Sequence, residues 1–391
     1  MASFRWLLPT LWLTALSVCG QAPLPPPLPN RLEHYTTPGP RHWRGTIGQQ
    51  PVTMQLDSGG SGYYGQYYYD RRGQPLRFSQ ASAKERKASQ IRFDETTDWK
   101  TTGYFLFTGP LRSPLSGTWH SPDGRRTLPV ALHETYADAL AYDTENWEVK
   151  QFMRDDSYDS TRLDSAELHQ YYLHFRPPFA AATRQLQAAL SRPVPPPRMN
   201  HYLDSLLHTR HTGQLEYFFH GETYVMYNSN HLFSVVQFEQ FTAAAEEDSG
   251  IYMHEWGQSH TYDLRTGRRL RLADLFLPGY EAYLRRWLLR ALKPIWNHEY
   301  YGDVGANGKL PAGGFLVTGT GLSFSYDDRD DESLGLPGPY HADRSIDVEI
   351  PYETLLPIIR PDGPLAVLLK ERQLRASSST AATAKRPSTS H

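Results

Sequence analysis

One stretch of this chain is the most informative about its fold, namely residues 261–276, Thr-Tyr-Asp-Leu-Arg-Thr-Gly-Arg-Arg-Leu-Arg-Leu-Ala-Asp-Leu-Phe. Apolar side chains alternate with polar ones on both sides of a turn at residues 265–267, namely Tyr262, Leu264, Leu270 and Leu272. Period-two alternation that is interrupted by a glycine-containing turn predicts a β-hairpin. Asp274 is typical of a residue that caps a helical turn, with Leu275 and Phe276 packed beneath it. The stretch predicts local structure and does not by itself indicate a reaction.

The composition favours a β-rich protein with two domains. A chain of 391 residues exceeds the roughly 150 residues that one domain commonly takes. Its 25 tyrosines suit half-buried sheet faces, and its 30 prolines and 29 glycines favour short elements joined by turns. The formal net charge of -2 provides no overall field that would attract nucleic acid.

The first residues predict export to the periplasm or the cell exterior. Arg5 precedes an apolar run from Leu7 to Val18, which is shorter than the roughly 20 residues of a membrane span but fits the core of a signal peptide. We expect cleavage after Gly20, so that residues 1–20 are removed. The only cysteine, Cys19, lies at this boundary and is either removed with the signal peptide or lipidated, although Val18 is large for a lipoprotein signal. Removal leaves a mature chain with no disulfide and no thiolate metal site.

Two regions are expected after the signal peptide and a proline-rich linker at 21–39. Between 40 and 135, strand patterns follow one another, and a phrase with an aromatic residue, an Asp-Gly turn and a leucine occurs at both 64–76 and 116–128. This repeat predicts two hairpins in one antiparallel sheet.

The second region, 136–372, combines strand and helix patterns and is followed by a tail at 373–391 that we expect to be disordered. Helix patterns occur at 183–191, 199–209 and 283–296, the last with an apolar face and a basic face. Strand patterns occur at 215–225, 232–241, 251–264, 315–317, 322–326 and 346–350, and a short helix is expected at 354–359. The predicted fold class is therefore α+β, with an antiparallel β module followed by a larger domain that has a mainly antiparallel sheet and packed helices.

The second half resembles a known family. Its motif residues are Gly257, His260, Tyr262, Asp263, Leu264, Gly267, Asp274, Leu275, Phe276, Pro351 and Tyr352. In this order they are similar to the signature of the C-terminal domain shared by the anti-sigma factor RsiV and the peptidoglycan deacetylase PdaC, over about residues 199–360. The resemblance implies an extracytoplasmic α+β domain. In RsiV this domain recognises lysozyme and in PdaC it accompanies a separate catalytic domain, so the resemblance implies no catalytic residue. Because only six residues precede the apolar run, we expect no cytoplasmic part that holds a sigma factor.

Patterns that would indicate catalysis or a metal site are weak. His254-Glu255 and His260 lack the four-residue helical spacing of a zinc protease, so structural histidines are favoured over ligands. His208 and His211 are weaker still, and the glycine-rich run 302–308 lacks the strand-to-helix context of a nucleotide site. The sequence therefore predicts no catalytic residue, no cofactor and no metal site.

One acidic run is the best predicted contact for a partner. Asp327, Asp328, Asp330, Asp331 and Glu332 interrupt the second half, without the spacing of a calcium-binding EF-hand loop. Opposite charge speeds encounter, so this run suits a cationic protein such as lysozyme. We expect a non-enzymatic binding protein of the cell envelope that recognises such a protein or a cell-wall glycan such as peptidoglycan. The alternatives are an envelope hydrolase that acts on glycans and a structural lipoprotein that reaches the membrane through a lipid on Cys19.

Overall fold

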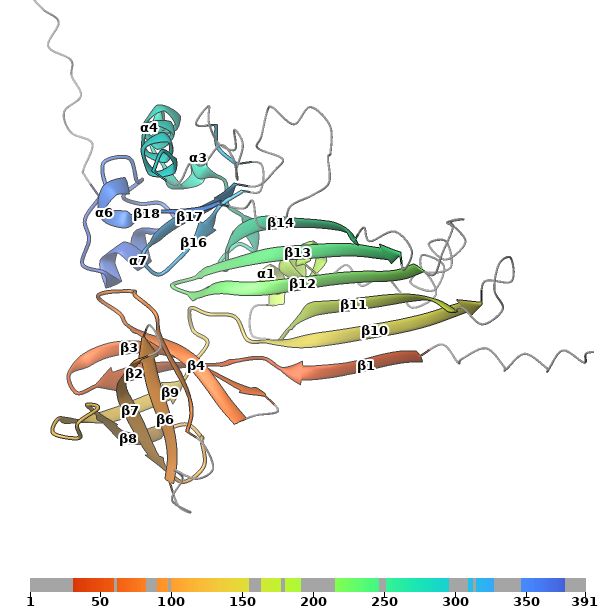
Figure 1. Ribbon diagram of the computed structural model, residues 1–391. Coiled ribbons are helices and arrows are strands. Elements are labelled where there is room, and N and C mark those ends of the chain that lie inside the picture. Colours follow the sequence, from red (N-terminus) through yellow and green to blue (C-terminus); the bar gives the residue numbers. More distant parts are fainter. Residues whose placement is uncertain are drawn as a thin grey trace, which may run out of the picture.

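The computed structural model describes residues 31–59, 62–81, 90–97, 100–154, 163–176, 180–190, 215–245, 251–294, 309–311, 314–326 and 346–376. These residues form a closed eight-stranded barrel, a seven-stranded sheet and a three-stranded sheet with short helices around it (Figure 1). Among the described residues, strand strongly predominates over helix. The expected α+β class therefore fits this fold only loosely.

The barrel is built from eight antiparallel strands in chain order. They are β2 (Arg41–Ile47), β3 (Gln50–Gly59), β4 (Gly62–Tyr69), β5 (Leu76–Gln80), β6 (Gln90–Thr97), β7 (Lys100–Thr108), β8 (Leu115–His120) and β9 (Thr127–Glu134). The repeated phrase forms the β4–β5 and β8–β9 hairpins, as predicted. The sheet does not stay open, because β2 pairs with β9 as well as with β3, for example Trp43 with Glu134.

The barrel interior is packed with aromatic rings. Phe78 and Phe93 lie 5.4 Å apart between ring centroids, and Tyr67 and Phe105 lie 5.3 Å apart, both edge to face. Eight strands enclose a space that side chains can fill, and rings prefer this edge-to-face contact. The barrel therefore has the character of a packed core.

The seven-stranded sheet has the order β1-β10-β11-β12-β13-β14-β15. Its strands are β1 (Arg31–Pro38), β10 (Tyr142–Arg154), β11 (Leu163–Phe175), β12 (Leu215–Ser229), β13 (Leu232–Ala245), β14 (Ile251–Asp263) and β15 (Arg268–Arg269). All neighbours are antiparallel except β11 and β12, which run parallel.

The first strand of this sheet lies in the segment that the sequence assigned to a linker. Residues 31–38 pair along their whole length with β10, and most of them are exposed. Main-chain pairing holds this edge strand together with a few side-chain contacts, such as the Tyr35–Glu148 hydrogen bond and the stacking of His34 on Trp147. It therefore needs no alternating apolar pattern. Because β1 and β10 are neighbours, the whole barrel is inserted between two adjacent strands of the larger sheet.

The third part surrounds a three-stranded sheet of β16 (Leu316–Val317), β17 (Gly321–Tyr326) and β18 (Ile346–Pro351). Around it lie α3 (Leu272–Leu275), α4 (Tyr280–Leu292), α6 (Tyr352–Leu355) and α7 (Ala366–Glu371). The expected amphipathic helix is α4, which buries Leu284, Leu288 and Leu292 in this core and exposes Arg285 and Arg286. The start of the predicted tail also packs here, since Leu374 and Ala376 lie against the same core.

A part-buried charge network joins the three parts, and we call it the junction. Arg44 of the barrel donates to Glu371 at the end of α7 (2.9 Å) and to Asp138 before β10 (2.7 Å). Asn230, in the β12–β13 turn, donates to the same two carboxylates, at 2.9 Å to Glu371 and 2.7 Å to Asp138. Close backbone approach adds to this contact, because a Cβ on Gly73 would lie 2.0 Å from the Gly319 carbonyl oxygen.

Several predicted segments lie outside the described residues. They are the signal peptide 1–20 with Cys19, the helix at 199–209, the glycine-rich run 302–308 and the tail from 377 onward. Within the part that the structure describes, every helix is too short or too polar to cross a membrane.

Candidate functional site

Residues 261–270 form a hairpin whose turn is built by Asp263. The Asp263 carboxylate accepts hydrogen bonds from Arg265 Nε (2.9 Å) and Nη2 (2.8 Å), and its carbonyl oxygen accepts one from the Gly267 amide (2.7 Å). Gly267 has a φ of 70°, in the left-handed region that glycine adopts without strain. The turn brings β15 back along β14, so that Arg269 pairs with Tyr262.

Most of the other motif residues are structural. Leu264, Leu275 and Phe276 are fully buried, and Tyr352 donates to the Thr318 carbonyl oxygen at 2.8 Å directly after Pro351 ends β18. Asp274 differs from the expectation, because it is the third residue of α3 and not its N-cap. Its carboxylate accepts the Arg271 backbone amide at 2.8 Å and so still satisfies a free donor at the helix start.

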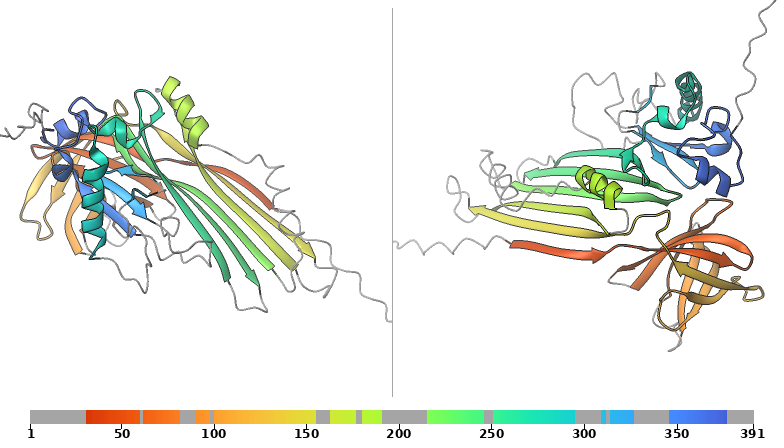
Figure 2. Two further views of the ribbon diagram at one scale, coloured as in Figure 1. Left: turned by 90° about the horizontal axis from the view of Figure 1, so that it is seen from above. Right: turned by 180° about the vertical axis from the view of Figure 1, so that it is seen from behind.

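A groove of about 720 Å³ lies on the seven-stranded sheet beside α1 (Ala180–Leu190), the helix that covers part of one sheet face (Figure 2). Three motif residues line it, namely His260, Tyr262 and Gly267. The other lining residues come from α1 and from strands β11 to β15: Gln170, Tyr172, Ala189, Leu190, Phe219, Gly221, Glu222, Thr223, Gln237, Phe238, Glu239, Gln258 and Arg269.

His260 is a neutral hydrogen-bonding group at this groove. Burial lowers its pKa to about 4, with help from the positive charge of Arg269. Its Nδ1 lies 2.8 Å from the Ser259 carbonyl oxygen, which can only accept, so Nδ1 carries the proton. Nε2 is therefore left as an acceptor at neutral pH.

Two charged residues of the groove have no ionic partner in the part of the chain that the structure describes. Arg265, Arg268 and Arg271 of the same hairpin each pair with Asp263 or Asp274, whereas Arg269 pairs with neither. The carboxylate of Glu239 likewise has no hydrogen-bonded or ionic partner among the described residues, although its backbone is paired within the sheet. A groove that keeps a guanidinium and a carboxylate unpaired has charges available for a ligand.

Glu222 lines the groove through its strand, but its carboxylate points away from it. Gly221 is the residue paired with Glu239, so Glu222 projects to the opposite face of β12. There it accepts from His220 Nε2 at 3.1 Å. Burial works to raise the pKa of Glu222, but hydrogen bonds from His220 and Tyr224 outweigh it and the pKa is lowered.

The opposite sheet face, which we call the aromatic face, carries an interlinked set of polar rings and carboxylates: Tyr35, Glu148, Tyr171, His220, Glu222 and Tyr224. Tyr35 and Tyr171 both donate to Glu148, at 2.8 and 3.4 Å. Although Tyr35 is 45% exposed, its hydrogen bond to Glu148 raises its pKa to about 12. The polar groups of this face satisfy one another, so it is less suited to a ligand than the groove is.

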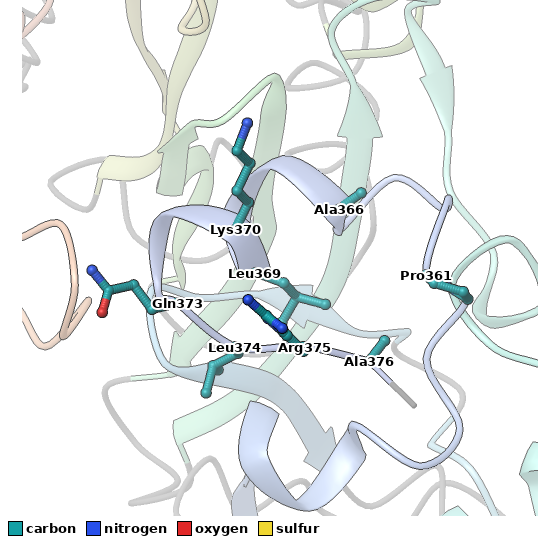
Figure 3. Close-up of a pocket in the computed structure, with 8 residues that line it drawn as sticks. All are labelled: Pro361, Ala366, Leu369, Lys370, Gln373, Leu374, Arg375 and Ala376. Carbon is teal, nitrogen blue, oxygen red and sulfur yellow. The ribbon is translucent and has the colours of Figure 1, made fainter. Parts of the chain in front are cut away.

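A second hollow of about 570 Å³ lies beside α7 (Figure 3). Its lining is Pro361, Ala366, Leu369, Lys370, Gln373, Leu374, Arg375 and Ala376, a single continuous stretch of the chain. Figure 3 shows Lys370 and Gln373 extending away from its middle. With no side chain from another strand or helix and no motif residue, it offers less specific recognition than the groove does.

The weak metal pattern is not brought together. β14 runs without a register shift through Gly257, which lies between the two histidines, so this described strand does not fold back there. His254 and His260 are six residues apart on it, which corresponds to about 20 Å. Among the described residues no group of three metal-ligating side chains occurs.

The acidic run Asp327, Asp328, Asp330, Asp331 and Glu332 lies outside the described residues, directly after β17.

The sequence analysis did not single out Arg269 or Glu239 as candidate binding residues. One signal was present, since the β13 face that begins with Phe233 and Val235 changes to Gln237 and Glu239 halfway along the strand.

Comparisons with known proteins find no match in sequence and a distant likeness in structure. No family model and no curated protein matches this chain. The crystal structure of a DUF3298 family member from Bacteroides fragilis NCTC 9343 is similar, with a TM-score of 0.42 and 16% identity, over 59% of this chain and 97% of that chain. A DUF3298 family protein from Pseudomonas aeruginosa PAO1 has a TM-score of 0.33 and 15% identity, over 56% of this chain and 94% of that one. Both of these structural neighbours are DUF3298 family proteins, and the resemblance to the RsiV and PdaC domain stays a prediction.

Proposed function

We propose that this protein is an exported, non-enzymatic binding protein of the cell envelope, which holds a piece of cell-wall polymer in the groove beside α1. The observation that supports this most is the set of unpaired polar groups on one groove face. Arg269, Glu239, Gln237, Gln258 and Thr223 have no side-chain partner among the described residues. A buried neutral histidine and a phenol at the same place add fixed hydrogen-bonding groups.

Binding is favoured over glycan hydrolysis by the direction of the carboxylates. Glycosidases use two carboxyl groups about 5 to 9.5 Å apart on either side of the scissile bond. Of the two glutamates among the described groove residues, Glu239 faces the groove and Glu222 faces the opposite side of the sheet. Incubation with peptidoglycan fragments should therefore leave their masses unchanged, and the appearance of shorter products would contradict the proposal.

The groove is tested with a variant that fills it. Thr223→Trp places a large ring on the groove face, opposite Gln237. Soluble peptidoglycan fragments should bind the natural protein, and the substitution should lower affinity at least about tenfold, since a side chain that overlaps the ligand costs more than about 1.4 kcal/mol. Thr36→Trp, on the exposed edge strand β1, is the control and should bind normally.

A cationic protein partner gives a different result in the same experiment. If lysozyme binds, and binds Thr223→Trp as well as the natural protein, the groove is not its site. Loss of that binding on neutralising 327–332 would then locate it at the acidic run. Retention of neither peptidoglycan nor lysozyme would overturn the proposed function.

Export is tested by the intact mass of the mature protein. Cleavage after Gly20 gives a chain that starts at Gln21 and contains no cysteine. A mass that retains Cys19 with an added lipid would instead support the structural lipoprotein. A mass that includes residue 1 in the envelope fraction would contradict removal of the signal peptide.

A further inference from the structure

We infer that the ligand of the groove is an extended zwitterionic peptide, whose terminal carboxylate binds Arg269 and whose amino group binds Glu239. This inference rests on the proposed function, because it names what the groove binds. It starts from the fact that the two unpaired charges of the groove have opposite signs and lie at different places along the sheet.

The spacing of Glu239 and Arg269 along the sheet, measured between main-chain positions, follows from strand register. Glu239 is paired with Trp256, and Arg269 is paired with Tyr262 on the same strand β14. Six residues of β-strand extend about 20 Å. A peptide in extended conformation covers about 3.3 to 3.6 Å per residue, so about six residues reach from one charge to the other.

The residues between the two charges suit a peptide backbone. Gln237 and Gln258 are paired across β13 and β14, between the positions of Glu239 and Arg269, and Thr223 is paired with Gln237 from the other side. A glutamine amide donates and accepts, as a peptide group does. A neutral sugar chain could use these amides as well, but it carries no charge for either Arg269 or Glu239.

The groups around Arg269 favour an anion there. His260 is neutral because burial lowers its pKa to about 4, and Tyr262 is buried with a raised pKa. Asp263 and Asp274, the nearest carboxylates in the hairpin sequence, are already paired with Arg265 and with Arg268 and Arg271. A carboxylate supplied by a ligand would be the partner that Arg269 lacks among the described residues, and guanidinium and carboxylate match as a two-bond pair.

The experiment is a double-mutant cycle read by NMR titration. The probe is a hexapeptide of alternating glycine and alanine with free termini, compared with the same peptide amidated at its C-terminus and with the one acetylated at its N-terminus. Amidation should weaken binding about tenfold or more, and Arg269→Gln should weaken the free peptide by a similar factor while leaving the amidated one unchanged. Glu239→Gln should weaken the free peptide by a similar factor and leave the acetylated peptide unchanged.

Arg268→Gln is the matched control, because Arg268 is the neighbouring residue on β15 and is paired with Asp274. It should bind both peptides like the natural protein, and thermal unfolding of all variants checks that they are folded. The inference is wrong if blocking the termini changes nothing, or if Arg269→Gln weakens free and amidated peptide equally. If a neutral oligosaccharide, chitohexaose, binds while the hexapeptide does not, this inference fails and the proposed binding function stands.

Discussion

Asp70 lies beside the junction, and its ionisation bears directly on the stability of the protein. It lies just after β4, accepts a hydrogen bond from Thr53 at 2.8 Å, and its carboxylate is 3.7 Å from Arg44 Nη1. Burial raises its pKa to about 6, with a further contribution from the negative charge of Glu371. The folded protein therefore keeps a proton on Asp70 at a pH where the unfolded chain has lost it.

Asp70→Asn should be more stable than the natural protein at neutral pH. Because the folded pKa lies above the unfolded value of about 3.8, the natural protein loses stability as pH rises from about 4 to 6. The neutral amide does not titrate, so the variant should gain up to about 3 kcal/mol in free energy of unfolding at pH 7. Urea unfolding at pH 4, 5, 6 and 7 measures this. An equal difference at every pH would show that the ionisation of Asp70 is not the cause.

At the residue scale the sequence singled out three residues that lie at the groove, although it did so because they belong to the family motif and not because it predicted a groove. His260, Tyr262 and Gly267 were singled out by the motif and line the groove. Arg269 also lies in residues 261–276. It stands out only because Arg265, Arg268 and Arg271 have ionic partners, and those pairs are seen only in the folded turn. Glu239 joins the site through its pairing with β12 and β14, which alternation along one strand cannot predict.

Among the elements, α1 is the one that forms a wall of the groove. Its Gln187 side chain donates to the Leu173 carbonyl oxygen and accepts from the Phe175 amide, both at 3.0 Å. The pairing of β11 with β12 ends at Tyr171, so this glutamine takes the place of a strand at the free edge of β11. Leu186 and Leu190 anchor the same helix in the core.

Gln187→Ala should loosen this helix without unfolding the protein. The Phe175 amide loses its acceptor, and a lost hydrogen bond of this kind costs about 1 kcal/mol. Hydrogen exchange of that amide should become several times faster, while exchange in β13 stays unchanged. Gln185→Ala, at an exposed position of the same helix, is the control. Equal protection in both variants would exclude this role of Gln187.

Helix α4 is held by its leucines and not by its arginines. Leu284 is fully buried against the three-stranded sheet, whereas Arg285 next to it is exposed. Leu284→Ala should lower the free energy of unfolding by about 2 to 5 kcal/mol, since it leaves a cavity in a packed core. Arg285→Ala should change it by less than about 0.5 kcal/mol. Chemical denaturation of both variants checks this, and similar losses in the two would contradict the assignment of faces.

At the same scale, the sequence predicted that strands exist better than which strands pair. The patterns at 215–225, 232–241 and 251–264 correspond to β12, β13 and β14. Closure of the barrel depends on the pairing of Trp43 with Glu134, and the parallel pairing of β11 with β12 joins residues about 50 positions apart. Neither pairing can be predicted from the alternation of apolar and polar residues along one strand. α7 was missed because it is short, with only Leu368 and Leu369 as its buried side chains.

In the whole molecule, the junction couples the barrel to both sheets through Arg44. Burial works to lower the pKa of this guanidinium, but Glu371 and Asp138 outweigh it and raise the pKa, so Arg44 stays charged. It also donates to Ser229 at 2.9 Å, next to the turn that carries Asn230. Removing it leaves two part-buried carboxylates without their cation.

Arg44→Gln should therefore weaken the attachment of the barrel as well as the overall stability. Breaking a buried ion pair on one side costs about 3 to 5 kcal/mol, and Arg44, with 23% of its side chain exposed, belongs at the lower end. Small-angle scattering should show a larger radius of gyration below the unfolding transition. Arg125→Gln, on the barrel surface with 89% of its side chain exposed, should change neither quantity. A stable and equally compact Arg44→Gln protein would argue against the junction as the coupling element.

Insertion of the barrel between β1 and β10 determines how the molecule carries mechanical load. A pull on the chain at Arg31, directed along β1, acts on the eight paired positions with β10 together and in shear. The barrel is attached beyond the other end of β1, so its own strands stay unloaded while this ladder holds. Tension that enters at residue 31 thus passes directly into the seven-stranded sheet, and the strands of the barrel do not carry it.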